Sequence, residues 1–183
     1  MGTADYGDVK SARSLSRVPL LRGFAPSELT ELARAMSVQH KPQGTTIVRQ
    51  GQIGSRDFYI LMEGTVEIRE DDMLVATRGP FAVFGEMAFI ANRRRTASVV
   101  AAEDCVVIRV DNDQVRALLE RHPLVAWKLM EAIAGLLCDR HAELDKRVRE
   151  LMARAPTELR DAYEKARASA LDGGQEQPTK ATT

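Results

Sequence analysis

The chain has 183 residues, its 26 basic and 26 acidic side chains cancel in formal charge, and 44% of its residues are hydrophobic. This length and composition suit one globular domain with an appended segment, and the neutral balance provides no overall field to attract nucleic acid or an anionic membrane. The longest apolar helical stretch, residues 124–138, is interrupted by Lys128 and Glu131, so no segment is expected to span a bilayer.

Residues that support catalysis or metal binding are scattered. His40, His122 and His141 are far apart and show no metal-ligand spacing, and no Ser, His and Asp set suggests a hydrolase. Cys105 and Cys138 do not form a disulfide framework and fit a reducing compartment. The first residues lack the profile of a signal peptide. We therefore predict a cytoplasmic protein that is not an enzyme and holds no metal or cofactor.

The N-terminal part of the chain is predicted to be irregular and then helical. Residues 1–16 are polar and are expected to form a mobile arm. After Pro26, apolar residues recur at helical spacing, which predicts a helix before the turn at residues 42–44. The apolar positions of this helix are Leu29, Leu32, Ala33 and Met36.

From residue 45 the hydrophobic period changes to that of β-strands. Short runs of β-branched and aromatic residues alternate with turn residues such as Gly51, Gly54 and Gly64. Several short strands at this spacing predict a mainly β fold, a small jelly-roll barrel with flanking helices. The predicted strands are residues 46–49, 58–62, 65–69, 74–77, 82–84, 97–101 and 106–110.

Two helices are predicted after the last strand. Residues 111–114, Asp-Asn-Asp-Gln, read as a capping box whose helix turns Val115, Leu118 and Leu119 inward. A calcium loop is excluded because the required glycine and terminal glutamate do not follow. Pro123 then begins a longer helix.

Apolar residues along the long helix alternate steps of three and four, as in a heptad seam with one polar position. The seam consists of Met130, Ile133, Leu137, His141, Leu144, Val148 and Leu151. The inner half of the helix can pack on its own barrel, but beyond Arg140 the barrel should be out of reach. The outer half therefore predicts a parallel homodimer, and packing within one chain remains the alternative.

A break at residues 155–156 precedes another helix start. Its apolar stripe is mostly alanine, which makes it a weak contributor to a core. The stripe consists of Leu159, Ala162, Tyr163, Ala166 and Ala170. Residues 172–183 are polar, contain glycine and proline, and are expected to be a disordered tail.

Residues 84–99, FGEMAFIANRRRTASV, carry the strongest functional signal. Gly85 permits a sharp turn and close backbone approach to a ligand. A short helix starting near Glu86 would present free N–H groups to an anion, while the carboxylate itself suits a ribose hydroxyl. Arg95 offers a permanently charged fork for a phosphate, and Ser98 a further hydroxyl from the next strand.

Each of these features has an ordinary structural explanation when it stands alone. A Phe-Gly-Glu triplet is common, Gly85 fits any turn, and residues 96–100 fit any strand. Arg93 and Arg94 are interpreted as exposed loop charges. It is the combination in this order and spacing that predicts a site for a ligand with a ribose hydroxyl at one end and a phosphate at the other.

This run resembles the phosphate-binding cassette of the cyclic-nucleotide-binding domain family. The family pattern is F-G-E-(aliphatic)-(small)-(apolar), then six residues onward an Arg, followed by x-A-(S/T)-V, and every fixed position is filled. The resemblance implies a β-roll domain over residues 17–140 and a helical extension over residues 141–171. The binding residues that it implies are Phe84, Gly85, Glu86, Met87, Ala88, Arg95, Thr96 and Ser98.

The resemblance also implies a ligand and a mechanism. The ligand is a 3′,5′-cyclic nucleotide, and cAMP is favoured over cGMP. Thr96 bears on this choice, because some cGMP-dependent members use a Thr here to contact guanine, while hyperpolarisation-activated channels with the same Arg-Arg-Thr-Ala-Ser-Val string favour cAMP. The helix after Pro123 would swing onto the purine as a lid, with Leu136, Leu137 and Arg140 at the appropriate distance.

Family members differ in what accompanies the cassette. Transcription factors add a helix-turn-helix module, and the 32 residues after Leu151 are too few for one. Kinase regulatory subunits carry two cassettes, and channels carry transmembrane helices. The expectation is therefore a free-standing sensor, or one that answers to a separate effector protein.

Two alternatives from other classes remain open. One is a nucleic-acid-binding protein that uses residues 93–95 and the basic face formed by Lys146, Arg147, Arg149 and Arg154. The other is a dimerising scaffold with a degenerate pocket. The neutral charge balance counts against the first, and the intact Glu86 and Arg95 count against the second.

Overall fold

The computed structural model describes residues 8–91 and 93–172. The chain divides into two compact units, Met1–Leu136 and Leu137–Thr183, and the boundary falls within a long helix. The first unit holds the β-strands and most of the helices, and the second holds the end of the long helix and one further helix.

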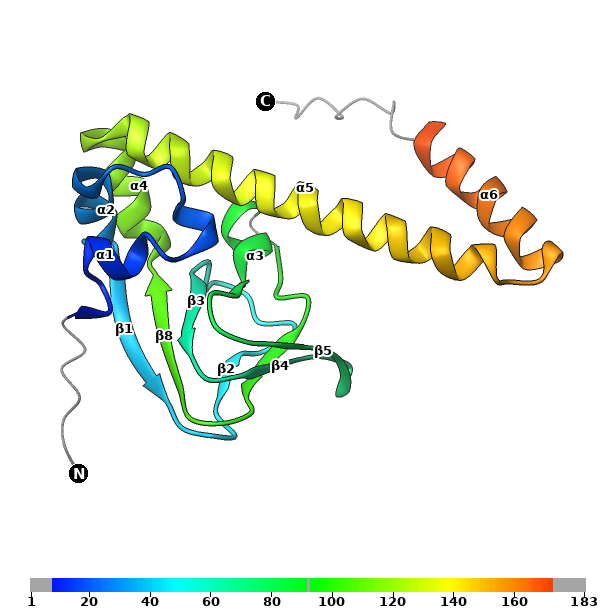
Figure 1. Cartoon of the computed structure of the whole chain (residues 1–183), viewed down its shortest axis with the longest axis horizontal. Coiled ribbons are helices and arrows are strands. Elements are labelled where there is room, and N and C mark those ends of the chain that lie inside the picture. The colour runs from blue at the N-terminus through cyan, green and yellow to red at the C-terminus, as the bar shows by residue number, and fades with distance from the viewer. Residues whose placement is uncertain (1–7, 92, 173–183) are drawn as a thin grey trace, which may run out of the picture. The chain divides into compact units, whose positions relative to one another are not determined.

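Two antiparallel four-stranded sheets form the jelly-roll predicted for the first unit (Figure 1). Their strand orders are β1-β8-β3-β6 and β2-β7-β4-β5. All seven predicted strands are present, with ends that differ by one or two residues. The strands are β1 (Met36–Lys41), β2 (Thr46–Val48), β3 (Phe58–Glu63), β4 (Val66–Glu70), β5 (Met73–Arg78), β6 (Val83–Phe84), β7 (Ser98–Ala101) and β8 (Cys105–Val110).

The core of the roll follows from the alternation of side chains along its strands. In β7, Val99 and Ala101 are buried while Ser98 and Val100 are only half-buried. The buried cluster consists of Val48, Tyr59, Leu61, Val66, Phe84, Val99, Ala101, Cys105 and Val107. Strand β3 differs, because Phe58–Leu61 are all buried. This is the pattern of a strand that has neighbours on both edges and is covered on both faces.

The helices of the first unit start at residues suited to that position. The Asp111 side chain accepts a hydrogen bond from the backbone N–H of Gln114 (3.0 Å), which confirms the predicted cap. Pro26 lies in the first turn of its helix, where a backbone N–H would have no acceptor within the helix, so its absence in proline costs no hydrogen bond. The helices are α1 (Ala12–Leu15), the 3-10 helix η2 (Pro19–Leu21), α2 (Pro26–Ala33), α3 (Glu86–Ala91), α4 (Asn112–Arg121) and α5 (Pro123–Ala153).

The prediction was wrong at Met36, which is not helical. Helix α2 ends at Ala33, and Met36 is the first residue of β1, where it pairs with Val110 of β8. Only two residues of β1, Met36 and Val38, are apolar. Local periodicity therefore gave no strand signal, and the pairing with a strand about 70 residues later determines the conformation.

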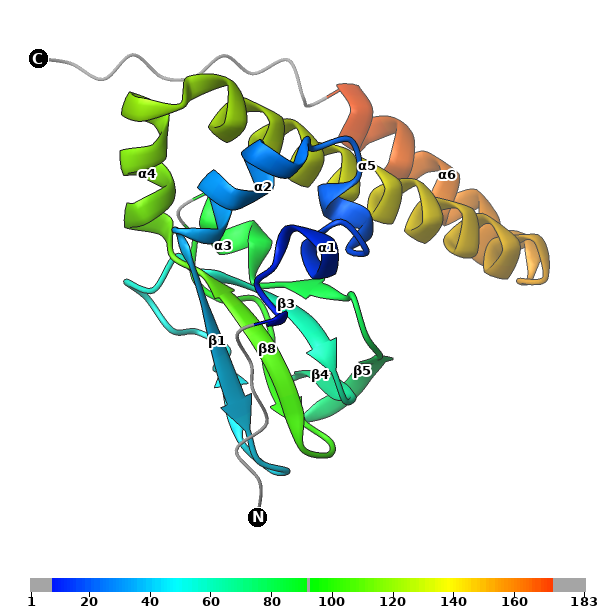
Figure 2. The same ribbon diagram turned by 60° about the vertical axis from the view of Figure 1, so that its left-hand side comes forward.

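The expected mobile arm also requires a correction. Helix α1 lies within residues 1–16, is capped by the Ser11 hydroxyl, and fully buries Leu15. Lys10 donates a hydrogen bond from its side chain to the carbonyl of Met36. The segment is thus tied to the roll from residue 10 onward (Figure 2). Residues 1–7 lie outside the described part of the chain.

In the second unit, the chain reverses direction between α5 and α6 (Thr157–Asp172) (Figure 1). The break and the new helix start are where the sequence predicted them. Asp145 of α5 forms ion pairs with Arg149 on the same helix (2.8 Å) and with Arg167 of α6 (3.3 Å). Helix α6 includes Asp172, the first residue of the expected tail, and residues 173–183 lie outside the described residues.

Candidate ligand-binding site

Helix α3 is fixed onto the roll by aromatic contacts on either side of Gly85. Before it, the Phe84 ring stacks on Tyr59 with 5.5 Å between the ring centroids. After it, the Phe89 ring meets Phe58 edge-on at 4.9 Å. Such pairs add to the free energy of burial. The short helix therefore has a defined position on β3, and the turn before it is held at both ends.

Gly85 occupies a position that excludes a side chain for two separate reasons. Its φ of +83° is a left-handed conformation that L side chains rarely adopt. A Cβ at this position would lie 2.7 Å from Nη1 of Arg95 and 3.2 Å from the carbonyl oxygen of Asp57. Glycine is thus required so that the turn can approach the Arg95 guanidinium.

Arg95 is the centre of this region, and it is only 4% exposed. Its Nη1 donates to the Gly85 carbonyl (2.8 Å), and its Nη2 donates to the Asp57 carbonyl (2.7 Å) and the Ser55 hydroxyl (3.2 Å). Its Nε is buried and has no acceptor among the described residues. Since a guanidinium has five N–H donors, the Nε–H and one Nη1 N–H are available to another acceptor.

The three acceptors of Arg95 are all uncharged, and no carboxylate forms an ion pair with Arg95 within the described part of the chain. Burial lowers the pKa of the guanidinium, and the charges on Asp57 and Glu86 oppose this shift. A buried cation without a paired anion is costly, because its lost hydration is not replaced. The site is therefore suited to receive an anion.

The backbone of Arg95 is held by the loop that follows β2. The N–H of Gly51 donates to the Arg95 carbonyl (2.8 Å), and the Arg95 N–H donates to the Gln52 carbonyl (3.1 Å). The Ser98 hydroxyl, at the start of β7, accepts from the Gln50 N–H (3.0 Å). These bonds fix the position of Arg95 relative to the strands.

The other predicted site residues are less closely grouped. Glu86 is buried at the first turn of α3, 4% exposed, and Ala88 is buried behind it. Met87 is 45% exposed, and its Sδ lies 4.0 Å from the hydroxyl of Thr96, which is also exposed. Arg93 is exposed too, as expected for a loop charge.

The predicted lid residues lie on α5, the helix that was predicted to start at Pro123. Leu136 is half-buried and belongs to the first unit, whereas Leu137 and Arg140 belong to the second. Their action as a lid remains a prediction.

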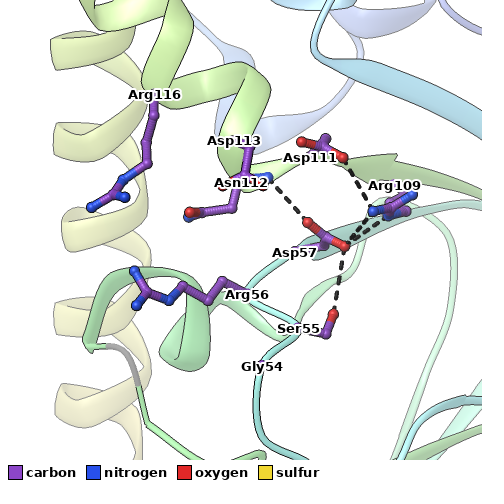
Figure 3. A pocket seen from close by; sticks show the side chains of 9 residues that line it. All are labelled: Gly54, Ser55, Arg56, Asp57, Arg109, Asp111, Asn112, Asp113 and Arg116. Atoms are coloured by element: carbon purple, nitrogen blue, oxygen red, sulfur yellow. Dashed lines mark hydrogen bonds and ion pairs between the residues drawn. The ribbon is translucent and has the colours of Figure 1, made fainter.

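Sequence reasoning missed Asp57, which links the cassette to the rest of the roll. Its carboxylate, from a residue that is 8% exposed, accepts from Arg109 Nε (2.7 Å) and from the Asn112 N–H (3.0 Å) (Figure 3). Arg109 is also paired with Asp111 (3.1 Å). The pairing of β3 with β8 places Tyr59 opposite Arg109, and this register brings Asp57 within reach. The signal in the sequence that could have indicated Asp57 is the position of a carboxylate directly before a fully apolar strand.

Other kinds of site find no support in the described residues. No group of three or more His, Cys, Asp or Glu side chains there is arranged to hold a metal ion. Among the helices in the described ranges, none combines the length and apolarity needed to cross a membrane.

Comparison with known proteins agrees with this geometry. The family model described as "Cyclic nucleotide-binding domain" matches residues 38–122. The "Cyclic AMP receptor protein" of Thermus thermophilus is 33% identical over 132 residues, which cover 69% of this chain and 61% of that protein. The chain thus spans less than two thirds of this relative.

Two solved structures support the same assignment. A cyclic nucleotide-binding-like protein from Brucella abortus is 32% identical, with a TM-score of 0.51 over 60% of this chain and 97% of that one. A cyclic nucleotide-binding domain from Methylobacillus flagellatus has a TM-score of 0.69 over 82% of this chain and 86% of that one. Its 22% identity shows similarity of fold alone.

Proposed function

Since this chain belongs to the cyclic-nucleotide-binding domain family, we propose that it is a regulatory protein that binds cAMP in preference to cGMP. The observation that carries the proposal is Arg95, a buried cation with a free Nε–H and no paired carboxylate in the described residues. The Thermus thermophilus relative is named for its binding of cyclic AMP, which supports the same ligand.

The residues around Arg95 suggest how the ligand is oriented. The cyclic phosphate accepts from the free N–H groups of Arg95, and the Gly85 turn allows it to come close. Glu86 at the start of α3 is the acceptor for a ribose hydroxyl. The Ser98 hydroxyl, which already accepts from Gln50, retains a proton to donate.

Calorimetric titration of the intact chain with cAMP and cGMP tests the proposal. We expect saturable binding of cAMP with a 1:1 stoichiometry per chain and a lower affinity for cGMP. Absence of saturable heat with both nucleotides would refute a ligand-binding role and favour the scaffold alternative.

The exposed hydroxyl of Thr96 is the candidate determinant of purine preference. If it contacts guanine, Thr96→Ala lowers cGMP affinity and leaves cAMP affinity unchanged, while Thr96→Ser retains both. A cGMP affinity tenfold above that for cAMP in the intact chain, lost in Thr96→Ala, would reverse the proposed selectivity.

We further propose that binding is transmitted by a population shift of α5, with Leu136, Leu137 and Arg140 covering the purine. The protein has no catalytic role in this scheme and acts on a separate effector protein. The free Cys105 and Cys138 are consistent with a cytoplasmic location. Steep salt dependence of binding to duplex DNA would instead support the nucleic-acid alternative.

The second candidate property is homodimerisation through the outer part of α5. Two seam residues, Leu144 (60% exposed) and Leu151 (65% exposed), remain open to solvent although α6 pairs with Asp145 of the same helix. Burial of each leucine would contribute about 1.5–3 kcal/mol. His141 is also exposed and would be the polar position of the interface.

Sedimentation of the intact chain at tens of micromolar tests this dimer. We expect a dimer that Leu144→Glu with Leu151→Glu converts to a monomer. Leu159→Glu, at an exposed leucine of α6 outside the seam, is the matched control and should leave the dimer intact. A monomeric intact chain, with and without cAMP, would refute the interface.

A further inference from the structure

A polar cavity lies beside the candidate site: Ser55 and Asp57, which accept hydrogen bonds from Arg95, line it, and the cassette residues 84–98 do not. It measures about 500 Å³, within the range that small-molecule sites occupy. Its walls come from the loop before β3, the end of β8 and the first turns of α4 (Figure 3). The lining residues are Gly54, Ser55, Arg56, Asp57, Arg109, Asp111, Asn112, Asp113 and Arg116.

The three arginines of this cavity fall into two kinds. Arg109 is neutralised by its ion pairs with Asp57 (2.7 Å) and Asp111 (3.1 Å). Arg56 and Arg116 form no ion pair or hydrogen bond with the described residues. They come from different elements, yet their guanidinium groups lie on the same side of the view in Figure 3. The cavity thus has two arginines without a counter-ion among the described residues.

The start of α4 provides an acceptor close to these arginines, three residues before Arg116. The Asp113 carboxylate also has no partner among the described residues, and it lies beside Asn112 at the start of α4. The lining as a whole carries three arginines and three aspartates, so its formal charge is zero. A simple anion would use only the arginines. A ligand that uses both the arginines and Asp113 has an anionic group and hydroxyl donors.

We propose that this cavity binds a small phosphorylated sugar, with the phosphate between Arg56 and Arg116 and the sugar hydroxyls against Asp113. Two planar guanidinium forks offer more donors than one carboxylate can accept, whereas a phosphate has three terminal oxygens to share between them. The proposal concerns a site separate from the one assigned to cAMP, and it does not depend on that assignment.

Titration of the full chain with ribose 5-phosphate, inorganic phosphate and ribose tests the proposal. We expect saturable binding of ribose 5-phosphate, weaker binding of phosphate alone, and none of ribose. Arg56→Ala and Arg116→Ala should each weaken ribose 5-phosphate binding by about tenfold or more, the effect of losing hydrogen bonds to a charged group. Neither side chain has a hydrogen-bond or ion-pair partner among the described residues, so the variants should unfold at the wild-type temperature.

Two controls separate this site from the cassette. Arg121→Ala, at an exposed arginine of α4 outside the cavity, should bind ribose 5-phosphate as the wild type does. Arg93→Ala, at an exposed arginine of the cassette loop that does not line the cavity, should do so too. No saturable binding up to about 10 mM, a loss in Arg121→Ala equal to that in Arg116→Ala, or full competition by cAMP would overturn the proposal.

Discussion

The two arginines that bind Asp57 illustrate different uses of a positive charge. Arg109 is bound to the Asp57 carboxylate, and this hydrogen bond raises the pKa of its guanidinium. Arg95 is bound to the Asp57 carbonyl, and burial lowers the pKa of its guanidinium. The first cation has its counter-ion within the fold, whereas the second lacks an ion-paired carboxylate in the described part of the chain.

This difference separates a structural arginine from a binding arginine. An ion pair that is complete within the chain links β3 to β8 and to the start of α4, and ligand binding would add nothing to it. A guanidinium held only by neutral acceptors has its position fixed and its charge unmatched. Such preorganisation favours an anionic ligand, because the geometry is already in place when the ligand arrives.

The largest expected effect comes from removing the binding arginine. Arg95→Ala should weaken cAMP binding by about 2–4 kcal/mol, or about 30- to 700-fold, because a desolvated phosphate loses its counter-charge. Calorimetric titration measures this change. Arg93→Ala, at an exposed arginine two residues earlier, is the matched control and should alter affinity little. Equal losses in the two variants would place the phosphate elsewhere.

Removing the structural arginine should instead lower stability. Arg109→Ala leaves the buried Asp57 carboxylate without its counter-ion, and we expect the free energy of unfolding to fall by about 1–3 kcal/mol. Urea denaturation measures the change, and Asp57→Asn in the same background should recover part of it. If Arg109→Ala is as stable as the wild type, the ion pair is not a structural link.

A substitution in the turn at Gly85 should have a smaller effect on stability and on cAMP affinity. Gly85→Ala should cost about 1–2 kcal/mol of stability, since its φ is positive, and should also weaken cAMP binding by displacing the Arg95 guanidinium. Gly79→Ala is the control, because Gly79 has an ordinary φ and no heavy atom within 4 Å of an added Cβ. A Gly85→Ala variant with unchanged urea midpoint and affinity would contradict the close approach.

Removal of an exposed ion pair, that of Glu28 with Lys128, should change stability least. The hydrogen bond from Lys128 lowers the pKa of Glu28 below its usual 4.5. The pair therefore stabilises the fold above that pH and loses its effect as the pH falls through the lowered pKa. Wild type and Glu28→Gln should differ slightly in urea midpoint at pH 7 and converge in acid. Glu120→Gln should match the wild type at both pH values.

The extent to which the sequence predicted this structure depended on how local each signal was. Some signals depend only on neighbouring residues: strand alternation, the Asp111 cap and the helix start at Pro123. All three are present in the structure. Strand β1 was missed because its conformation depends on β8, and the burial of Leu15 was missed because helix α1, with four residues, is too short to show a helical period.

The same distinction holds at the candidate site. The cassette is one continuous segment, so its spacing alone predicted that Gly85 and Arg95 would face the same ligand. Their direct contact, in which Nη1 of Arg95 donates to the Gly85 carbonyl, was not predicted. Ser55 and Asp57 precede β3, whereas Arg109 lies in β8, and the pairing of β3 with β8 brings Arg109 to Asp57. Sequence spacing contains no information on such contacts.

The central claim is that Arg95, and not Arg109, meets the charge of the ligand. Urea denaturation of wild type, Arg95→Met and Arg109→Ala, with and without cAMP, tests it most directly. Wild type and Arg109→Ala should each gain about 2.7 kcal/mol of stability at a cAMP concentration 100-fold above the dissociation constant. Arg95→Met should gain almost nothing at the same concentration. An equal gain in Arg95→Met and in the wild type would contradict the account.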